Sequence, residues 1–463
     1  MKNNPQKSKI ESTAEMTRRR FLGTSLGAAG IAGFPTIIPA SALGKDGKAA
    51  PSERVTIGLI GCGNRAGSAR TYLGVPDAEI VALADPFGRR IAAWKKRASK
   101  KGKNFKEYKD FREMLAGDVD AVHITTGDHW HVPSLLLSAR AGKHVYVEKP
   151  LGVSIEQCLA CREITNEKKD LKIQYGTQNR STVYVRGSME VILNGHIGEV
   201  KDIYVWAPKG ASGGKSAEEP VPDDLDYEMW LGPAAPAPFC HDRAVQQGAR
   251  NGIFHIYDYA IGFLAGWGAH PMDQFQWWLD ETGAGMPEQV QATGTIPTEG
   301  LFNTATHWDA LLKYPGGREV RFSDHESIAK HLPKLEGFKA AGHGTLFVGS
   351  EGWIYCHRGG FKASSKELLM KHRDPGERKV VNAGKSHFHN FVDAVLGRNK
   401  TVSPLDSAIR SDITCHLTDL AIRHGGTVAW DAKEHTITGN EAAKKALHRP
   451  MRKPWDVLNP KYT

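Results

Sequence analysis

The chain has 463 residues, of which 40% are hydrophobic and 24% are charged. These are the proportions of a folded globular protein, which excludes a disordered or fibrous one. The formal charge is +10, but residues 1–42 hold six Lys or Arg and two Asp or Glu, so the rest carries +6. Much of that excess lies in residues 95–103, where a solvated helix face is favoured over a nucleic-acid site. We therefore expect no nucleic-acid partner.

The first 42 residues have the layout of an export signal. Arg18-Arg19-Arg20 follows a polar segment and precedes an uncharged run over 21–43, and Ala40-Ser41-Ala42 offers a small-x-small cleavage site. We predict a twin-arginine signal peptide over 1–42, a linker over 43–54, and a periplasmic or otherwise exported protein. An ordinary disordered N-terminus is the alternative. No other apolar run reaches membrane length, so we expect no stable membrane span after cleavage.

Short apolar runs rich in β-branched residues alternate with helical patterns from residue 55 onward. Strands are expected over 57–60, 80–84, 121–125, 144–147 and 172–175, and helices over 109–115 and 132–141. This alternation favours a parallel, doubly wound sheet. We predict a Rossmann domain over 55–178.

The first of these strands runs into the turn Gly61-Cys62-Gly63-Asn64-Arg65-Ala66. The two Gly allow a tight turn and a close approach of a pyrophosphate, and the following helix would bind its charge. Asp85 ends the next strand, where it can accept hydrogen bonds from a ribose diol and repel a 2′-phosphate. NAD is therefore favoured as the cofactor, while Arg89 and Arg90 keep NADP possible. A strand–turn–helix without phosphate is the alternative.

The second half of the chain has longer strand patterns. Strands are expected over 200–207, 306–314, 319–322 and 346–355, with a turn at 315–317 and terminal helices over 386–396 and 405–424. We predict an α/β domain with a large, mostly antiparallel open sheet over 179–440, followed by a tail over 441–463.

Two groups of residues could suggest a metal ion. Cys158 and Cys161 form a C-x-x-C at a helix start, but no second pair stands at zinc spacing, so two buried thiols are favoured. Asp128, His129 and His131 share a loop with no further ligand set. We therefore predict no metal site.

Several motifs resemble the glucose–fructose oxidoreductase, inositol dehydrogenase and rhizopine catabolism (Gfo/Idh/MocA) family. They are Thr126-Gly127-Asp128-His129-Trp130-His131, Glu148-Lys149-Pro150, Gly176-Thr177-Gln178-Asn179-Arg180 and Gly266-Trp267-Gly268-Ala269-His270-Pro271-Met272-Asp273. The resemblance covers about residues 55–430 and is typical of an exported branch. It implies a Rossmann domain joined to an α/β domain whose open sheet often forms the oligomer interface, so a homodimer or homotetramer is expected. It also implies oxidation or reduction of a sugar, cyclitol or glycoside at a secondary alcohol, with NAD held tightly in some exported relatives.

The resemblance also assigns residues to the cofactor and the substrate. The expected cofactor contacts are Gly61, Gly63, Asn64, Arg65, Asp85, Thr126, Asp128, His131, Glu148, Lys149 and Gln178. The expected substrate contacts are His129, Trp130, Arg180, Tyr227, Trp230 and Trp267. Aromatic rings can stack on a sugar face, with core packing as the alternative for each ring.

Three residues are expected to act in catalysis. Lys149 would polarise the substrate hydroxyl and steady the developing alkoxide, with its pKa lowered by partial burial. His270 is expected to accept the proton, because imidazole titrates near neutrality. Many family members carry an Asp four residues before this His, where this chain has Gly266; Asp273, Asp258 or His255 could substitute. The missing Asp leaves two alternatives to a dehydrogenase open: a redox-neutral glycosidase or lyase that uses a transient 3-keto sugar, and a non-catalytic sugar-binding relative.

Overall fold

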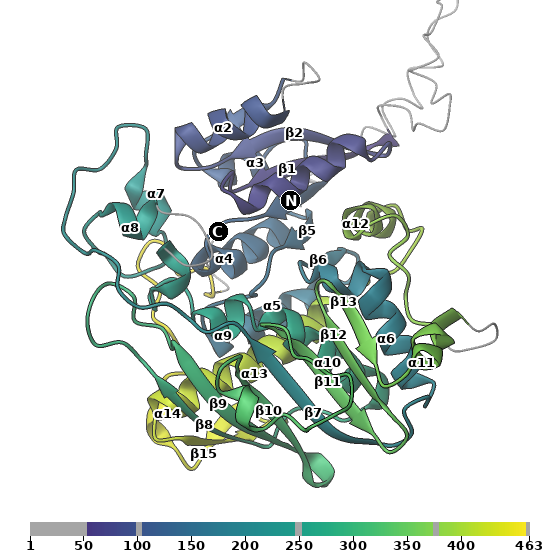
Figure 1. Cartoon of the computed structure of the whole chain (residues 1–463). Helices are drawn as coiled ribbons and strands as arrows, with labels where there is room; N and C mark the ends of the chain where they lie inside the picture. Colours follow the sequence, from purple (N-terminus) through teal and green to yellow (C-terminus); the bar gives the residue numbers. More distant parts are fainter. Residues whose placement is uncertain (1–52, 99–103, 246–251, 374–378, 460–463) are drawn as a thin grey trace, which may run out of the picture. The chain divides into compact units, whose positions relative to one another are not determined.

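A computed structural model describes residues 53–98, 104–245, 252–373 and 379–459 (Figure 1). The predicted signal peptide and most of the predicted linker lie outside the described residues. Among the described residues, no helix is both long and apolar enough to cross a membrane.

The first half of the described chain is built on a six-stranded parallel sheet with the order β3-β2-β1-β4-β5-β6. Its strands are β1 (Val55–Ile60), β2 (Ala78–Ala84), β3 (Lys106–Tyr108), β4 (Ala121–Ile124), β5 (His144–Val147) and β6 (Ile173–Tyr175). Its helices are η3 (Arg65–Gly74), α2 (Gly88–Ala98), α3 (Phe111–Leu115), α4 (Asp128–Arg140), α5 (Ile155–Glu167) and η5 (Gln178–Ser181). The doubly wound parallel sheet is confirmed. The helix expected after the glycine turn is a 3₁₀ helix, η3.

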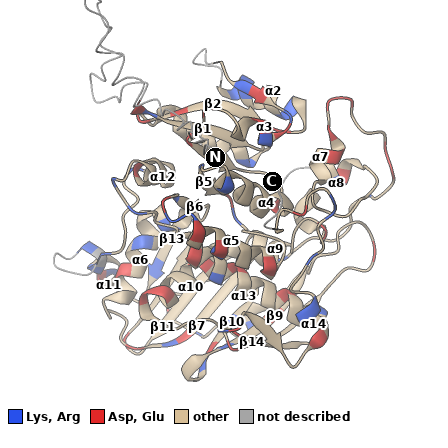
Figure 2. Cartoon of the chain, turned by 180° about the vertical axis from the view of Figure 1, so that it is seen from behind, with Lys and Arg blue, Asp and Glu red and all other residues tan. Residues whose placement is uncertain are grey.

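Local sequence explains why these elements pack. Gly58 in β1 leaves room for Met114 of α3, whose sulfur would lie 2.7 Å from a Cβ at that position. In α2, Ile91 and Trp94 are buried while Lys96 and Arg97 are exposed, so the basic residues form the solvated face that the sequence predicted (Figure 2).

The second half contains a nine-stranded sheet with the order β13-β12-β11-β7-β10-β9-β8-β14-β15. Only the β10–β7 pair is parallel, so the predicted mostly antiparallel sheet is confirmed. The strands are β7 (Val200–Ala207), β8 (Gln289–Thr295), β9 (His307–Tyr314), β10 (Arg318–Asp324), β11 (Gly344–Gly349), β12 (Trp353–His357), β13 (Gly360–Ala363), β14 (Thr427–Asp431) and β15 (Thr436–Thr438). In β9, buried and partly exposed residues alternate, which leaves one face of the sheet for helices to cover.

One strand prediction is wrong. Residues 346–355 form parts of two antiparallel strands, β11 and β12, rather than one. The chain reverses between them, and the Gly349 N–H donates to the Gly352 carbonyl at 2.8 Å. A Cβ on Gly349 would lie 2.0 Å from the Ile197 carbonyl oxygen, so the turn needs Gly there for a close approach that an apolar pattern does not reveal.

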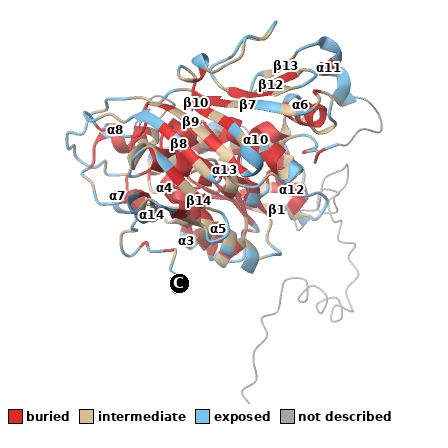
Figure 3. Ribbon diagram, turned by 90° about the horizontal axis from the view of Figure 1, so that it is seen from below, coloured by how far each residue is buried: buried red, intermediate tan, exposed pale blue. Residues whose placement is uncertain are grey.

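The helices of the second half are α6 (Val183–Leu193), α7 (Tyr227–Leu231), α8 (His241–Ala244), η6 (Gly252–His255), α9 (Phe263–Gly266), α10 (Ala269–Thr282), η7 (Pro315–Gly317), η8 (Ile328–Lys330), α11 (Lys366–Met370), η9 (Lys371–Arg373), α12 (His387–Val395), α13 (Leu405–Arg423) and α14 (Glu441–Lys445). Of the longer helices, α6, α10 and α13 pack on strands of the second sheet. The long helix α13 is buried along most of its length and packs against α5, α10 and β8, so it joins the two sheets into one core. Figure 3 shows the buried residues gathered where α10 and α13 lie on the sheet.

The predicted tail packs back onto the first half. Trp455 is buried and contacts Trp130 of α4 edge to face, with ring centroids 5.3 Å apart. The Arg112 guanidinium lies over the Trp455 ring, 4.7 Å from its centroid. Arg140 of α4 donates to the Val457 carbonyl at 2.9 Å. The end of the described chain therefore supports α4.

Candidate functional site

A cavity of about 590 Å³ opens at the carboxyl ends of β1, β2 and β4. Ile60, Ala84 and Thr125 line it on the side of the first sheet, and Trp267 and His270 line it on the side of the second half. The carboxyl edge of a doubly wound sheet is where such folds bind ligands. Residues predicted for the cofactor and residues predicted for the substrate therefore line one cavity.

The glycine turn fits a dinucleotide. Gly61 has φ +87°, and a Cβ there would lie 2.8 Å from the Thr125 carbonyl oxygen and the Thr126 nitrogen. Only glycine allows β1 to turn so close to the end of β4. Gly61, Gly63, Asn64, Arg65 and Thr126 all line the cavity, as predicted for cofactor contacts.

Asp85 lies in the cavity wall at the end of β2. Its carboxylate accepts hydrogen bonds from the Cys62 N–H at 2.7 Å and the Phe87 N–H at 2.9 Å, so it joins the glycine turn to the loop after β2. Burial raises its pKa. Arg89 is held by Asp224 at 2.7 Å, whereas Arg90 lines the cavity and donates to the Ala244 carbonyl. The carboxylate position suits the ribose diol of NAD.

Glu148 supports two other cofactor residues from behind the cavity wall. One carboxylate oxygen lies 2.6 Å from the Arg65 guanidinium and accepts a hydrogen bond from the Gln178 amide at 2.9 Å. Arg65 and Gln178 line the cavity, whereas Glu148 is buried and does not. Its predicted direct contact with the cofactor is therefore corrected to an indirect one, made through the side chains of Arg65 and Gln178.

Lys149 lies in the cavity wall between the two halves. Its Nζ donates to the Gly266 carbonyl oxygen at 2.7 Å. Burial lowers its pKa, and the opposing effects of Glu148 and Asp128 do not cancel this. The backbone of Gly266 thus gives Lys149 a partner at the position where many family members carry Asp. Sequence reasoning missed this contact because every residue has a carbonyl.

His270 stands in the first turn of α10 and lines the cavity. Burial lowers its pKa well below the usual value, and Lys149 and Arg358 add to the shift. Its Nδ1 has no hydrogen-bond partner among the described residues. The imidazole is therefore neutral at neutral pH and able to accept a proton, although it does not titrate near neutrality as the sequence suggested.

Arg180 and Asp273 form a buried ion pair instead of facing the cavity. The Arg180 guanidinium is 2.8 Å from the Asp273 carboxylate, and the side chains are only 2% and 1% exposed. Arg180 also donates to Ser407 and lies over the Trp277 ring. Neither residue lines the cavity. The predicted substrate contact of Arg180 and the predicted catalytic role of Asp273 are corrected, since a buried guanidinium needs a carboxylate beside it.

The first turn of α4 fixes neighbouring segments. The His129 ring is paired with the Trp230 carbonyl at 3.0 Å, and the His131 ring with the Pro150 carbonyl at 2.6 Å. Burial lowers the pKa of both His129 and His131 to about 4 and raises that of Asp128 to about 7. His129 lines the cavity, whereas Asp128 and His131 do not, which corrects their predicted cofactor contacts to supporting positions.

Aromatic side chains form much of the remaining wall. Trp130, Trp230 and Trp267 line the cavity as predicted. Tyr227 does not: it stacks on Trp230 and donates to the Ala237 carbonyl at 3.0 Å, so its predicted substrate contact is corrected to a support for that ring. The lining residues that sequence reasoning missed include Met229, Phe254, Phe263 and Arg358.

Two groups of potential metal ligands occur in the described part of the chain, and neither lines the cavity. One is Cys158, Asp412 and His416, all buried. Asp412 accepts the Leu151 and Gly152 N–H groups at 3.1 and 3.2 Å, and burial raises its pKa to about 6. Cys158 and Cys161 are free and buried, as expected. The other group is His307, Asp324 and Glu326.

Fold and cavity together define a protein with a Rossmann half and an α/β half that meet at one cavity. Residues 55–177 match the NAD-binding Rossmann fold of the Gfo/Idh/MocA oxidoreductase family, and residues 181–457 match the family's C-terminal alpha/beta domain. The chain belongs to this family. The predicted family, fold class and NAD cofactor are thereby confirmed.

The chain is similar to proteins with different activities. Inositol 2-dehydrogenase of Rhizobium meliloti (strain 1021) is 32% identical over 153 residues, which are 33% of this chain and 44% of that protein. A glycosyl hydrolase family 109 protein of Streptomyces niveus is 28% identical over 163 residues, which are 33% of this chain and 32% of that protein. The matched region thus spans less than half of each relative.

A solved structure is similar over most of the chain. The WlbA dehydrogenase from Bordetella pertussis, in complex with NADH and UDP-GlcNAcA, has a TM-score of 0.56 with 16% identity and covers 82% of this chain and 99% of that one. At this identity the likeness establishes the shared fold.

Proposed function

We propose that this protein is an NAD-dependent oxidoreductase that acts on a secondary hydroxyl of a sugar, cyclitol or glycoside. One observation carries the proposal: the Lys149 Nζ and the neutral His270 ring line the same cavity as the glycine turn and Asp85. That arrangement places a cation and a proton acceptor beside the dinucleotide site. The inositol 2-dehydrogenase relative supports the substrate class.

Lys149 and His270 divide the proton chemistry. Protonated Lys149 donates a hydrogen bond to the substrate oxygen and stabilises the alkoxide as it develops. Neutral His270 accepts the hydroxyl proton. NAD, when bound, supplies the hydride acceptor. Trp230 and Trp267 exclude water and hold the sugar face.

Replacement of Lys149 tests the assignment. Lys149→Ala should abolish turnover of any sugar that the wild type oxidises while bound NAD is retained, because the dinucleotide turn does not depend on this side chain. The exposed Lys96 of α2 gives the matched control, Lys96→Ala, which should keep wild-type turnover. Full activity of the Lys149 variant would refute the catalytic assignment.

We also propose that the protein is exported through the twin-arginine pathway with NAD already bound, and that it recycles this cofactor as a homodimer or homotetramer. The Arg18-Arg19-Arg20 pattern beside a dinucleotide site supports this, because nicotinamide cofactors are made in the cytoplasm. The mature protein should be purified after export and denatured, and its NAD(H) and NADP(H) quantified by mass spectrometry. Near-stoichiometric NAD is expected. An empty protein that fails to bind added NAD would contradict the proposal.

A redox-neutral glycosidase is the second candidate. The relative named as a glycosyl hydrolase family 109 protein and the absence of the family Asp at Gly266 favour it. Transient oxidation at C3 would acidify the C2 proton and allow the aglycone to leave C1 by elimination. Water would then add across the C1–C2 double bond, with its hydroxyl at C1 and a solvent proton at C2, and the hydride would return to C3. Reaction in D2O should then place deuterium at C2 of the product. A product without label at C2 would exclude this route.

A further inference from the structure

The cavity contains a cationic side chain that no part of the proposed mechanism uses. Arg358 lies in the turn between β12 and β13 and lines the cavity together with Lys149 and His270. Within the described ranges, no acidic side chain forms an ion pair with its guanidinium. Its only hydrogen bond there is a backbone one, from the Arg358 N–H to the His343 ring at 3.3 Å. The guanidinium is thus available to a ligand.

The groups around Arg358 do not neutralise its charge. The His343 ring packs against Trp267, with centroids 5.1 Å apart, and its pKa is lowered to about 4, first by burial. His343 and His270 are therefore neutral, and Lys149 is the other cation at this end. Glu148 and Asp128 both raise the pKa of Lys149, and Glu148 is already held by Arg65.

The cations at the dinucleotide end are engaged differently. Arg65 is paired with Glu148, and Arg90 donates to the Ala244 carbonyl. Both belong to the first half of the chain, next to the glycine turn and Asp85. Arg358 comes from the far edge of the second sheet and meets the cavity beside Trp267 and His270. Its position is that of a substrate contact rather than a cofactor contact.

We infer that Arg358 binds a carboxylate of the substrate, so that the substrate class is a uronic acid or its glycoside rather than a neutral sugar. A single planar guanidinium matches a carboxylate through two parallel hydrogen bonds. A phosphate dianion would bring a second negative charge, and Lys149, the other cation at this end, is required at the reacting oxygen. The inference rests on the proposed function, because the same cavity must hold the reacting sugar.

Exposure of Arg358 is consistent with this role. The residue is exposed to solvent, so water hydrates the guanidinium until a ligand arrives. A carboxylate that replaces this water beside the Trp267 ring gains a charge-assisted hydrogen bond in a partly desolvated place. The acid group would also fix which hydroxyl of the ring faces Lys149.

Equilibrium binding to the NAD-loaded mature protein tests the inference. The probes are methyl β-D-glucuronoside and methyl β-D-galacturonoside, each beside the matching neutral glycoside and sugar 6-phosphate, in a buffer without carboxylate or phosphate. We expect isothermal titration to show at least one uronoside bound about tenfold or more tightly than its neutral partner, a difference of about 1.4 kcal/mol. Arg358→Gln should remove this preference, and Arg358→Lys should restore only part of it because the fork is lost.

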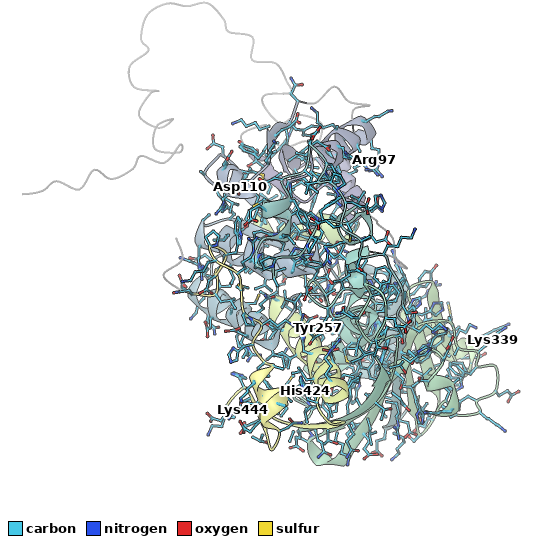
Figure 4. The ribbon with its side chains drawn as sticks, turned by 90° about the vertical axis from the view of Figure 1, so that its left-hand side faces the viewer. Arg97, Asp110, Tyr257, Lys339, His424 and Lys444 are labelled. Carbon is cyan, nitrogen blue, oxygen red and sulfur yellow. The ribbon has the colours of Figure 1, made fainter. Side chains whose placement is uncertain are left out.

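The matched control is Arg97→Gln. Arg97 is exposed on α2, at the outer surface of the first half (Figure 4), and lies outside the cavity lining. Arg97→Gln should keep the preference for the uronoside. Arg97→Gln and Arg358→Gln should both bind NAD as the wild type does. Failure of both uronosides to bind, equal binding of acid and neutral glycosides, or an unchanged preference in Arg358→Gln would overturn the inference. Tighter, Arg358-dependent binding of a 6-phosphate would overturn the assignment to a carboxylate.

Binding and turnover separate the two proposals. Lys149→Ala should retain the Arg358-dependent preference although it cannot transfer hydride. If the wild type binds a uronoside through Arg358 but never reduces its bound NAD or changes the sugar, the proposed function fails while the ligand assignment stands. If a neutral sugar alone binds and is oxidised, the ligand assignment fails and the proposed function stands.

Discussion

The two ends of the cavity differ in how their polar groups are satisfied. At the cofactor end, Asp85 accepts two backbone N–H groups and Glu148 holds Arg65 and Gln178. At the substrate end, the Nδ1 of His270 and the guanidinium of Arg358 have no side-chain partner among the described residues. The protein therefore builds the cofactor end before any ligand binds, and leaves hydrogen-bonding capacity at the other end for a substrate.

The largest effect is expected from a change at the cofactor end of the cavity. Gly61→Val should abolish NAD binding and lower the melting temperature, because a side chain there meets the Thr125 carbonyl at 2.8 Å and its φ of +87° strains any residue with a Cβ. Gly74→Ala is the control, since nothing lies within 4 Å of a Cβ at that position. Titration with NAD and thermal unfolding measure both effects. Normal NAD affinity in Gly61→Val would show that the turn is not the dinucleotide site.

A second change removes one partner of the buried ion pair between Arg180 and Asp273, which lies outside both ends of the cavity. Arg180→Ala should destabilise the fold by about 3–5 kcal/mol, because it leaves the buried Asp273 carboxylate without its cationic partner. Replacement of both residues by Met and Leu should cost less than the single change. Urea denaturation gives the free energies of unfolding. If Arg180→Ala instead kept full stability and raised only the KM for substrate, the interior placement would be contradicted.

A third change weakens hydrogen bonds at the cofactor end of the cavity without introducing a steric clash. Glu148→Gln should raise the Kd for NAD about 10-fold or more, because the amide keeps an acceptor oxygen for Arg65 and Gln178 but loses the negative charge, and hydrogen bonds to charged groups contribute about 1.5–3 kcal/mol. Binding of a sugar to the NAD-saturated variant should be unchanged. Equilibrium dialysis measures the Kd for NAD, and calorimetry measures the binding of the sugar. An equal loss of affinity for NAD and for the sugar would mean that the two ends of the cavity are not independent.

The smallest expected effect concerns pH. Burial raises the pKa of Asp128 to about 7, and the ionised carboxylate raises the pKa of Lys149. Activity that needs protonated Lys149 is present below the pKa of Lys149 and is lost as pH rises through it. Asp128→Asn removes the negative charge, so the alkaline limb of the kcat profile should move to lower pH. The acid limb, assigned to His270, should stay in place. An unchanged alkaline limb would contradict the coupling of Asp128 to Lys149.

Sequence reasoning succeeded where chemistry depends on near neighbours. Gly61 and Asp85 end adjacent parallel strands, so their spacing alone predicts that they meet at one sheet edge. It failed where partners are distant or hidden in the backbone. Arg358 reaches the cavity because the turn between β12 and β13 lies there, and the Gly266 carbonyl is a backbone group that leaves no signal in the sequence. Asp273 follows His270 by less than one helical turn, yet Arg180 draws it into the core.

The contact between Trp455 and Trp130 has a consequence for the order in which the protein is completed. The ribosome makes α4 more than three hundred residues before it makes Trp455. During that interval, the face of α4 that carries Trp130 has no cover from the end of the chain. A nascent first half therefore displays this apolar face until the segment that carries Trp455 has been made, which makes the face a natural place for a chaperone to bind.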